Sequence, residues 1–275
     1  MKKIPFTKMS GAGNDFVVID NRNNIITDPV GFVQNACRKK YGIGADGALL
    51  VEKSTKADFT MKYYNSDGTC GGMCGNGGRC ISKFVYTHNI ITKTEFTFEA
   101  FDYIYKAKIL PDGNVELLMK NPSQIQLQKK IVLDGKEVTI HSINTGAPHA
   151  VMFTNENGFD LETMDFENVG RKLRFHFCFG NEGSNINLIQ EISPNILKIR
   201  TYERGVEAET LACGTGSVAS SVAYHLLKKV NPPITLLVRS GEKLQVNFQS
   251  KNEVITNVTL TGPAEEVFEG EFPVK

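Results

Sequence analysis

The chain has 275 residues, of which 41% are hydrophobic and 22% charged, and its net charge is +1. This composition is typical of globular protein, with enough length for one large domain or two modest ones. No Lys/Arg run indicates binding to nucleic acid or to an anionic membrane, and no apolar run is long enough to span a bilayer. Because the N-terminus lacks a signal peptide, the six cysteines are expected to be reduced thiols in the cytoplasm.

The first half of the chain is predicted to consist of short strands around a helix. Strands are expected at 4–8, 16–19, 48–52 and 59–64, and across 96–119 with a turn at 111–113. The helix is expected to begin at Pro29 with Asp28 as its N-cap, to carry Val30 and Val33 on its apolar face, and to end at Gly42.

The second half repeats this order of elements. The segment Gly146–His149 matches 11–14, and a helix capped by Asp165 matches the one capped by Asp28. The separations between matched positions are 135 (149−14), 136 (166−30), 138 (203−65) and 139 (213−74), so they rise smoothly. Chance matches would scatter, so a duplicated domain is predicted, with a boundary near 120–122.

Each half contains one cysteine followed by Gly-x-Gly. The two copies are Cys74-Gly75-Asn76-Gly77 and Cys213-Gly214-Thr215-Gly216, and helix-forming residues follow each copy, in the first from Cys80 to about Tyr86. Glycine lets backbone N–H groups approach a ligand closely, and the positive end of a helix dipole favours a carboxylate and a thiolate. The pattern therefore predicts two reactive thiols at helix N-termini.

Two opposed thiols fit one class of reaction. Inversion of a stereocentre beside a carboxylate removes a proton from one face of a carbon and delivers another to the opposite face. A cysteine pair can act as base and acid if the thiol pKa is depressed toward the working pH. In the duplicated chain, Cys74 and Cys213 are expected to face each other across a cleft, with the helix N-termini stabilising the enolate-like charge.

The chain resembles the diaminopimelate epimerase family over nearly its whole length. The motifs that carry the resemblance are 11–16, 65–68, 74–77, 146–149, 182–185, 202–205 and 212–216, in the order found in that family. The resemblance implies an α/β fold of the α+β type, with two homologous pseudo-twofold domains and the active site in the cleft between them. Each domain is expected to be a curved, mostly antiparallel sheet or barrel around a central helix. The implied bounds are 1–119, to which 263–275 return, and 120–262.

The resemblance also implies residue roles. Cys74 and Cys213 are the acid/base pair, with Cys213 taking the proton in the LL to meso direction, and His149 and Glu203 tune the thiols. The substrate-binding residues implied are Asn14, Asn65, Gly75, Asn76, Asn185, Glu203, Arg204, Gly214 and Thr215. The implied enzyme is a homodimeric isomerase of lysine and peptidoglycan-precursor biosynthesis that uses neither a cofactor nor a metal.

Two positions depart from the family pattern. Relatives usually have Asn-Pro-His where this chain has Ala147-Pro148-His149, and often have Gln at the position of Gly47. Neither change touches the two thiols. We therefore expect the same reaction, with weaker or rearranged binding of the distal end of the substrate.

Other interpretations of single motifs have less support. Cys70 and Cys74 have the spacing of a zinc-binding pair, but no second pair follows. The glycine-rich segment 42–47 imitates a dinucleotide-binding loop, yet it follows a predicted helix instead of a strand. Cys37 and Cys178 are interpreted as core residues, and Cys80 as either a core residue or a residue behind the reacting thiol.

Two alternative functions remain open on the sequence. A proline or hydroxyproline racemase-like enzyme would also use two thiols, but such enzymes usually have His where this chain has Asn76. A non-catalytic amino-acid-binding protein could have kept the duplicated cleft, although retention of both cysteines argues against it. Isotope exchange from solvent separates a binding protein from an enzyme.

Overall fold

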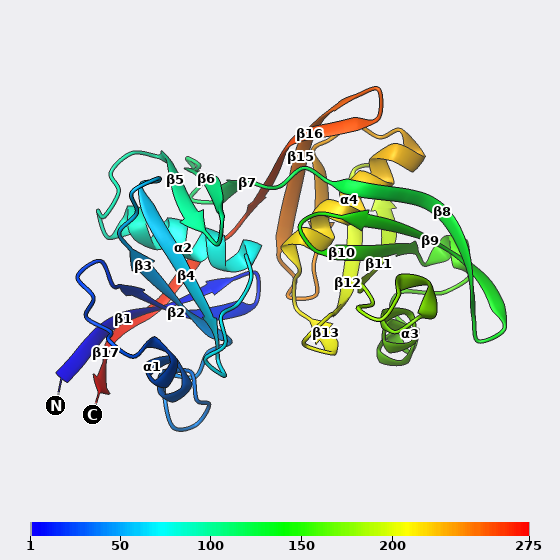
Figure 1. Ribbon diagram of the computed structural model, residues 1–275. Coiled ribbons are helices and arrows are strands. Elements are labelled where there is room, and N and C mark those ends of the chain that lie inside the picture. The colour runs from blue at the N-terminus through cyan, green and yellow to red at the C-terminus, as the bar shows by residue number, and fades with distance from the viewer. Residues whose placement is uncertain (1, 275) are drawn as a thin grey trace. The chain divides into compact units, whose positions relative to one another are not determined.

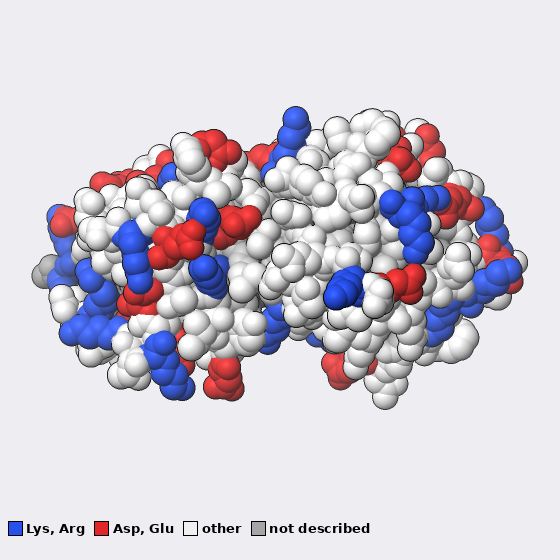
Figure 2. All heavy atoms as spheres, turned by 90° about the horizontal axis from the view of Figure 1, so that it is seen from above, with Lys and Arg blue, Asp and Glu red and all other residues white. Residues whose placement is uncertain are grey.

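A computed structural model describes residues 2–274, which divide into two compact units. The first unit contains the residues up to Leu118 and those from Thr261 onward, and the second contains Met119–Leu260. No helix among the described residues combines the length and the apolar character needed to cross a bilayer. On the face shown in Figure 2, basic and acidic side chains are interspersed, in keeping with the net charge of +1.

The first unit is a mostly antiparallel sheet with two helices (Figure 1). Its strands are β1 (Lys2–Gly11), β2 (Asn14–Asp20), β3 (Gly47–Glu52), β4 (Phe59–Asn65), β5 (Glu95–Ala100), β6 (Tyr103–Ile109), β7 (Val115–Leu118) and β17 (Glu265–Val274), and its helices are α1 (Pro29–Ala36) and α2 (Gly75–Thr87). Only the pairs β2–β3 and β4–β5 are parallel among the strand pairs described in this unit. Helix α2 packs against six of the first seven strands and against β17, and ten of its residues are buried, so it is the central helix of this unit.

The second unit repeats this pattern. Its strands are β8 (Ser123–Leu133), β9 (Lys136–Asn144), β10 (Pro148–Phe153), β11 (Asn185–Ser193), β12 (Ile196–Glu203), β13 (Ala208–Thr210), β14 (Ile234–Leu237), β15 (Lys243–Lys251) and most of β16 (Val254–Gly262). Its helices are α3 (Phe166–Arg174), α4 (Gly214–Lys228) and the short 3₁₀ turns η1 (Asn155–Asn157) and η2 (Phe177–Phe179). Twelve residues of α4 are buried, which makes it the counterpart of α2.

The strand pairing confirms the predicted repeat. In the first unit, β2 and β3 are parallel, and β3 and β4 are antiparallel. In the second unit, β10 and β11 are likewise parallel, and β11 and β12 are likewise antiparallel. Ala48 pairs with Tyr64, and Ile186 pairs with Tyr202, so both members of the pair are displaced by 138 residues (186−48 and 202−64). The mixed α/β fold and the mostly antiparallel sheets are therefore as predicted.

Several predicted elements have different bounds. The first strand extends over 2–11 instead of 4–8. Helix α1 has the predicted cap, because the Asp28 side chain accepts from Gly31 N–H, but it ends at Ala36 instead of Gly42. The chain then folds back, so that Ile43 N–H donates to Ala36 O over 2.7 Å and occupies a free carbonyl of the last turn. Val30 was expected on the apolar face, yet it is 45% exposed.

Helix α2 begins at Gly75, five residues before the predicted start, so Cys80 lies in its second turn and is fully buried. Glycine has low helix propensity, which is why Gly75–Gly78 looked like a loop. Packing overrides this preference, because a Cβ atom on Gly78 would lie 2.6 Å from Met73 Cε and 3.0 Å from Leu117 Cδ1. The absence of a side chain lets the first turns of α2 lie close against their neighbours.

Candidate active site

Each unit places one cysteine at the N-terminus of its central helix. Cys74 is the N-cap of α2, with φ −103° and ψ 119°, and Cys213 is the N-cap of α4, with φ −127° and ψ 111°. The carbonyl of each accepts the first helical hydrogen bond, from Gly78 N–H over 2.8 Å and from Ser217 N–H over 2.9 Å. Neither thiol caps its helix. The first-turn N–H groups at the thiol end favour an anion, whether a thiolate or a substrate carboxylate.

In the first unit, a chain of directed hydrogen bonds holds Asn76 and Asn14. The buried guanidinium of Arg79 donates to Asn76 Oδ1 over 2.9 Å, which turns Asn76 Nδ2 toward Asn14 Oδ1 at 2.6 Å. Asn14 Nδ2 in turn donates to Asp46 Oδ2 over 2.9 Å. A permanent cation at one end and a carboxylate at the other fix the orientation of both amides. The side chain two residues after Cys74 is therefore held in one orientation.

In the second unit, the equivalent position is Thr215, and its partner is His149. His149 Nε2 lies 2.9 Å from Thr215 Oγ1, which lies 3.5 Å from Cys213 Sγ. The first turn of α4 is held further by Thr145 Oγ1, which donates to Thr215 O over 2.9 Å. Thus Asn14 and His149, which the sequence repeat matches, each contact the residue two positions after a cysteine.

The tautomer of His149 follows from its surroundings. Burial, with a smaller contribution from the charge of Arg204, lowers the His149 pKa to about 3, so the ring is neutral near pH 7. Asn187 Nδ2 donates to Ala150 O and lies 3.1 Å from His149 Nδ1, while Asn187 Oδ1 accepts from Thr201. Nδ1 of His149 therefore accepts, and Nε2 carries the proton. Nε2–H donates to Thr215, whose hydroxyl hydrogen is then free to point at Cys213 Sγ.

The predicted binding residues outside the helix termini lie at strand ends. Asn65 ends β4 and donates to Thr69 Oγ1 over 3.0 Å. Asn185 begins β11 and is buried, with Nδ2 donating to Pro148 O and Oδ1 accepting from Arg204 N–H, both over 2.9 Å. Each amide group retains capacity for a further hydrogen bond.

Glu203 and Arg204 follow one another where β12 ends. The Arg204 guanidinium is partly exposed and lies 3.6 Å from the Glu182 carboxylate, which is 90% exposed. Such an exposed pair is weak and easily exchanged for another carboxylate. A hollow of about 90 Å³ has Pro148, His149, Gly183 and Ser184 in its wall. A larger hollow of about 500 Å³, lined by parts of β8, β9 and α4, contains none of the predicted site residues.

The remaining cysteines do not share the environment of Cys74 and Cys213. Cys37 is buried in the core of the first unit, and burial raises its pKa to about 12. Cys178 is half-buried at the edge of the core of the second unit, where burial also raises its pKa. Cys70 is exposed. Among the described residues, one group of His and carboxylate side chains could hold a metal ion, and neither Cys74 nor Cys213 belongs to it.

Three residues that hold the site were not predicted from the sequence, namely Arg79, Asp46 and Asn187. Arg79 lies two residues after the Cys74–Gly77 motif, and a charged residue among buried helical positions is the signal that could have identified it. Asn187 and Asp46 carried no such signal. Their importance depends on neighbours far along the chain, for example His149, which is 38 positions before Asn187.

Comparison with known proteins identifies the family. The family model for diaminopimelate epimerase matches residues 6–125 and 141–267. The chain belongs to the diaminopimelate epimerase family. It is 43% identical to the diaminopimelate epimerase of Flavobacterium psychrophilum, with 95% of this chain and 97% of the relative covered. It is 38% identical to that of Aquifex aeolicus, with 96% of both covered.

Solved structures share the fold of the diaminopimelate epimerase family at low identity. A probable proline racemase from Agrobacterium radiobacter has a TM-score of 0.74 at 15% identity, with 99% of this chain and 93% of that chain covered. A hydroxyproline epimerase from Agrobacterium vitis has a TM-score of 0.71 at 17% identity, with 98% and 92% covered. At these identities the likeness establishes the α/β fold alone.

The two positions expected to depart from the family pattern differ in their structural surroundings. A Cβ atom on Gly47 would lie 2.4 Å from Tyr64 O and 2.7 Å from Tyr63 Cε2, so the β3–β4 pairing leaves no room for a side chain. Ala147 precedes Pro148 in a turn and is partly exposed, with its carbonyl accepting from Thr145 N–H over 3.1 Å. A side chain is therefore sterically excluded at Gly47, whereas Ala147 is partly exposed.

Proposed function

We propose that the protein interconverts LL- and meso-diaminopimelate, an isomerase reaction of lysine and peptidoglycan-precursor biosynthesis. One observation carries this proposal: in a member of the diaminopimelate epimerase family, each of the two repeated units has a cysteine as the N-cap of its central helix. Two thiols are the number that direct inversion of a carbon requires. The substrate is a small molecule whose reacting carbon bears a carboxylate.

In the proposed mechanism, the thiolate of Cys213 removes the α-proton of the LL-isomer. The C–H bond breaks, its electron pair moves into the carboxylate, and the Cys74 thiol delivers a proton to the opposite face of the same carbon. The hydrogen bond of Thr215 toward Cys213 Sγ supports the first step, because a donor to sulfur favours the thiolate. His149 acts through Thr215 and stays neutral throughout.

The helix N-termini are the proposed site for the reacting carboxylate. N–H groups at Gly75, Asn76, Gly214 and Thr215 lie in the first turns of α2 and α4, where negative charge is most favourable. The charge on the carboxylate grows as the proton leaves, so these N–H groups stabilise the transition state more than the ground state. No cofactor is required in this scheme, because the electron sink is the carboxylate itself.

The distal end of the substrate is an amino acid group with both charges. We propose that the Arg204 guanidinium exchanges its weak contact with Glu182 for the distal carboxylate, and that Glu203 accepts from the distal ammonium. The amides of Asn14, Asn65 and Asn185 lie at the ends of β2, β4 and β11 and supply further contacts.

The two units are the proposed epimerase domains, with bounds near 119 and 261. We further propose that the enzyme acts as a homodimer in the cytoplasm. Sedimentation of the purified protein and fractionation of cells test these two points separately from the chemistry.

The function is tested by incubating the protein with LL-diaminopimelate in deuterium oxide and following the α-carbon protons by NMR. The α-proton signal should disappear as meso-diaminopimelate accumulates, without added pyridoxal phosphate or metal. Proline and hydroxyproline are the control substrates. Binding of diaminopimelate without exchange would indicate a binding protein, and exchange confined to proline would indicate a racemase of cyclic amino acids.

A further inference from the structure

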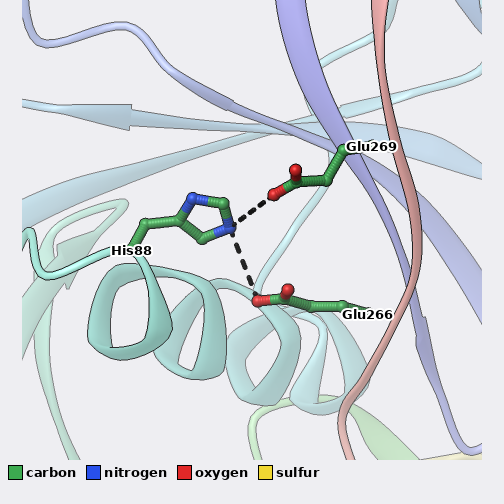
Figure 3. Close-up of side chains that lie close together, drawn as sticks. All are labelled: His88, Glu266 and Glu269. Carbon is green, nitrogen blue, oxygen red and sulfur yellow. Dashed lines mark ion pairs between the residues drawn. The ribbon is translucent and has the colours of Figure 1, made fainter.

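A histidine and two glutamates converge at the far end of α2 from Cys74 (Figure 3). His88 is the C-cap of α2, and its Nε2 atom lies 3.5 Å from Glu266 Oε1 and 3.5 Å from Glu269 Oε1 on β17. All three ligand atoms lie within 4.8 Å of one another. Their side chains are 29%, 31% and 65% exposed, so solvent ions can reach the group. The proposed epimerase chemistry does not use it.

A β-bulge brings the two glutamates together. Residues three apart on a regular strand point to opposite faces of the sheet. In the β1–β17 ladder, however, Lys8 pairs with Phe268 and Met9 pairs with Glu266, so Val267 is an extra residue. The extra residue in such a bulge shifts the alternation of side chains between the two faces of the sheet by one residue. Glu266 and Glu269 thereby reach the same face, where His88 lies.

The distances suit a shared ion better than a hydrogen bond. An N–H···O hydrogen bond has a donor–acceptor distance of about 2.7–3.2 Å, which is shorter than the distance from His88 Nε2 to either carboxylate or to Thr7 Oγ1, at 3.4 Å. Two ligands that bind one ion at about 2.1 Å in tetrahedral geometry lie about 3.4 Å apart. The observed 3.5 Å is close to that value for both carboxylates.

The local electrostatics also favour a cation. The C-terminal end of a helix carries partial negative charge, and the last turn of α2 contains no basic residue. Two carboxylates add to that negative potential. Thr87 Oγ1 donates to Glu266 and so orients one of the carboxylates from outside the group.

We propose that His88, Glu266 and Glu269 form a binding site for a divalent metal ion of the zinc class. One imidazole nitrogen and two carboxylate oxygens are ligands that Zn²⁺ accepts, and water completes its four-coordinate shell. The ion ties the end of α2 to β17, the strand through which the end of the chain pairs with β1. Thirteen residues of α2 separate it from Cys74, about 20 Å, so its role is structural.

Titration calorimetry on the chelator-treated protein tests this site. We expect one saturable Zn²⁺ site with a Kd in the micromolar range, weakened at least tenfold in each of His88→Gln, Glu266→Gln and Glu269→Gln. Glu271→Gln is the matched control, because Glu271 lies on the same strand but pairs with Lys3. An unchanged Kd in all three variants, or no saturable binding, overturns the proposal.

Cobalt substitution separates this site from the thiols. A Co²⁺ ion held by His88 and two carboxylates should give weak visible bands without a thiolate-to-cobalt charge-transfer band. Strong charge transfer at one equivalent would place the ion on a cysteine and refute the assignment. Free Zn²⁺ at a concentration of about ten times its Kd should raise the Tm of the wild type by roughly 2–4 °C, and that of His88→Gln by less than 1 °C. Epimerase activity is a separate readout, so failure of either proposal leaves the other intact.

Discussion

His149 Nε2 donates a hydrogen bond to Thr215 Oγ1 over 2.9 Å, and this hydroxyl lies 3.5 Å from Cys213 Sγ. His149 is therefore linked to the Cys213 thiol through Thr215, whose carbonyl oxygen also accepts a hydrogen bond from Thr145. Its neutral state is maintained by burial, and its tautomer by Asn187. A histidine near a reactive cysteine is often interpreted as its proton acceptor, but we expect His149 to act as a positioning residue.

This relay predicts different results for two substitutions at Thr215. Thr215→Val keeps the shape and removes the hydroxyl, and it should lower kcat/KM roughly 10- to 100-fold, the value of a hydrogen bond to a charged group. The acidic limb of the pH–rate profile should move to higher pH, because the thiolate loses a donor. Thr215→Ser keeps the hydroxyl and should remain within a few-fold of wild type. Equal activity of the Val and Ser variants would exclude the relay.

The two N-cap cysteines should be individually indispensable. Cys74→Ala or Cys213→Ala should reduce epimerisation by many orders of magnitude, since the two thiols act as one unit. The control is Cys37→Ala, which should cost about 1 kcal/mol of stability and leave turnover unchanged, because Cys37 is a buried, protonated core residue. Steady-state kinetics and urea unfolding measure the two effects. Substantial turnover by Cys74→Ala would eliminate the two-thiol mechanism.

Ala147 tests whether an amide contact has been lost. Ala147→Asn should leave kcat nearly unchanged and lower KM roughly fivefold, the equivalent of about 1 kcal/mol for one hydrogen bond. Ala147→Leu has a similar volume without the amide and should not tighten binding. An unchanged KM in the Asn variant would show that another group or a water already makes this contact.

Substitution of Gly47 should destabilise the fold, in contrast to the gain in substrate binding expected for Ala147→Asn. Gly47→Gln introduces the residue that the family resemblance implies at this position, but its Cβ atom would meet Tyr64 O at 2.4 Å. The β3–β4 pairing must shift, so we expect a loss of about 1–3 kcal/mol in the free energy of unfolding. Gly72→Ala is the control, because its Cβ would meet nothing within 4 Å. Full stability of Gly47→Gln would mean that the sheet adapts without strain.

Two buried histidines predict sensitivity to acid. Burial lowers the pKa of His149 to about 3 and that of His141 to about 4, below the unfolded value of 6.5. Between pH 6.5 and these values the unfolded chain binds protons that the folded chain does not, so stability falls as pH falls. At pH 5 each histidine should cost about 2 kcal/mol relative to pH 8. Urea midpoints at several pH values measure this, and His141→Gln should remove about half of the pH dependence.

Short-range patterns in the sequence were sufficient for much of the fold. Asp28 and Asp165 cap their helices as predicted, because an N-cap needs only a side-chain oxygen and an N–H a few residues away. The smooth offset between the halves predicted a duplicated domain, and the strand pairing of the two units repeats accordingly. Glycine counts misled at Gly75–Gly78, where propensity favoured a loop and close packing favoured a helix.

The tertiary structure decided how the site is held. The sequence by itself placed Cys74 and Cys213 at helix N-termini and matched His149 to Asn14, because helix termini and repeat positions are local or periodic features. It did not show that Asn187 sets the tautomer of His149, nor that an extra residue in β17 turns Glu266 and Glu269 toward His88. These relationships depend on strand register and on contacts between residues far apart along the chain. Hydrogen-bond direction and ligand spacing are properties of three-dimensional positions, and local composition does not encode them.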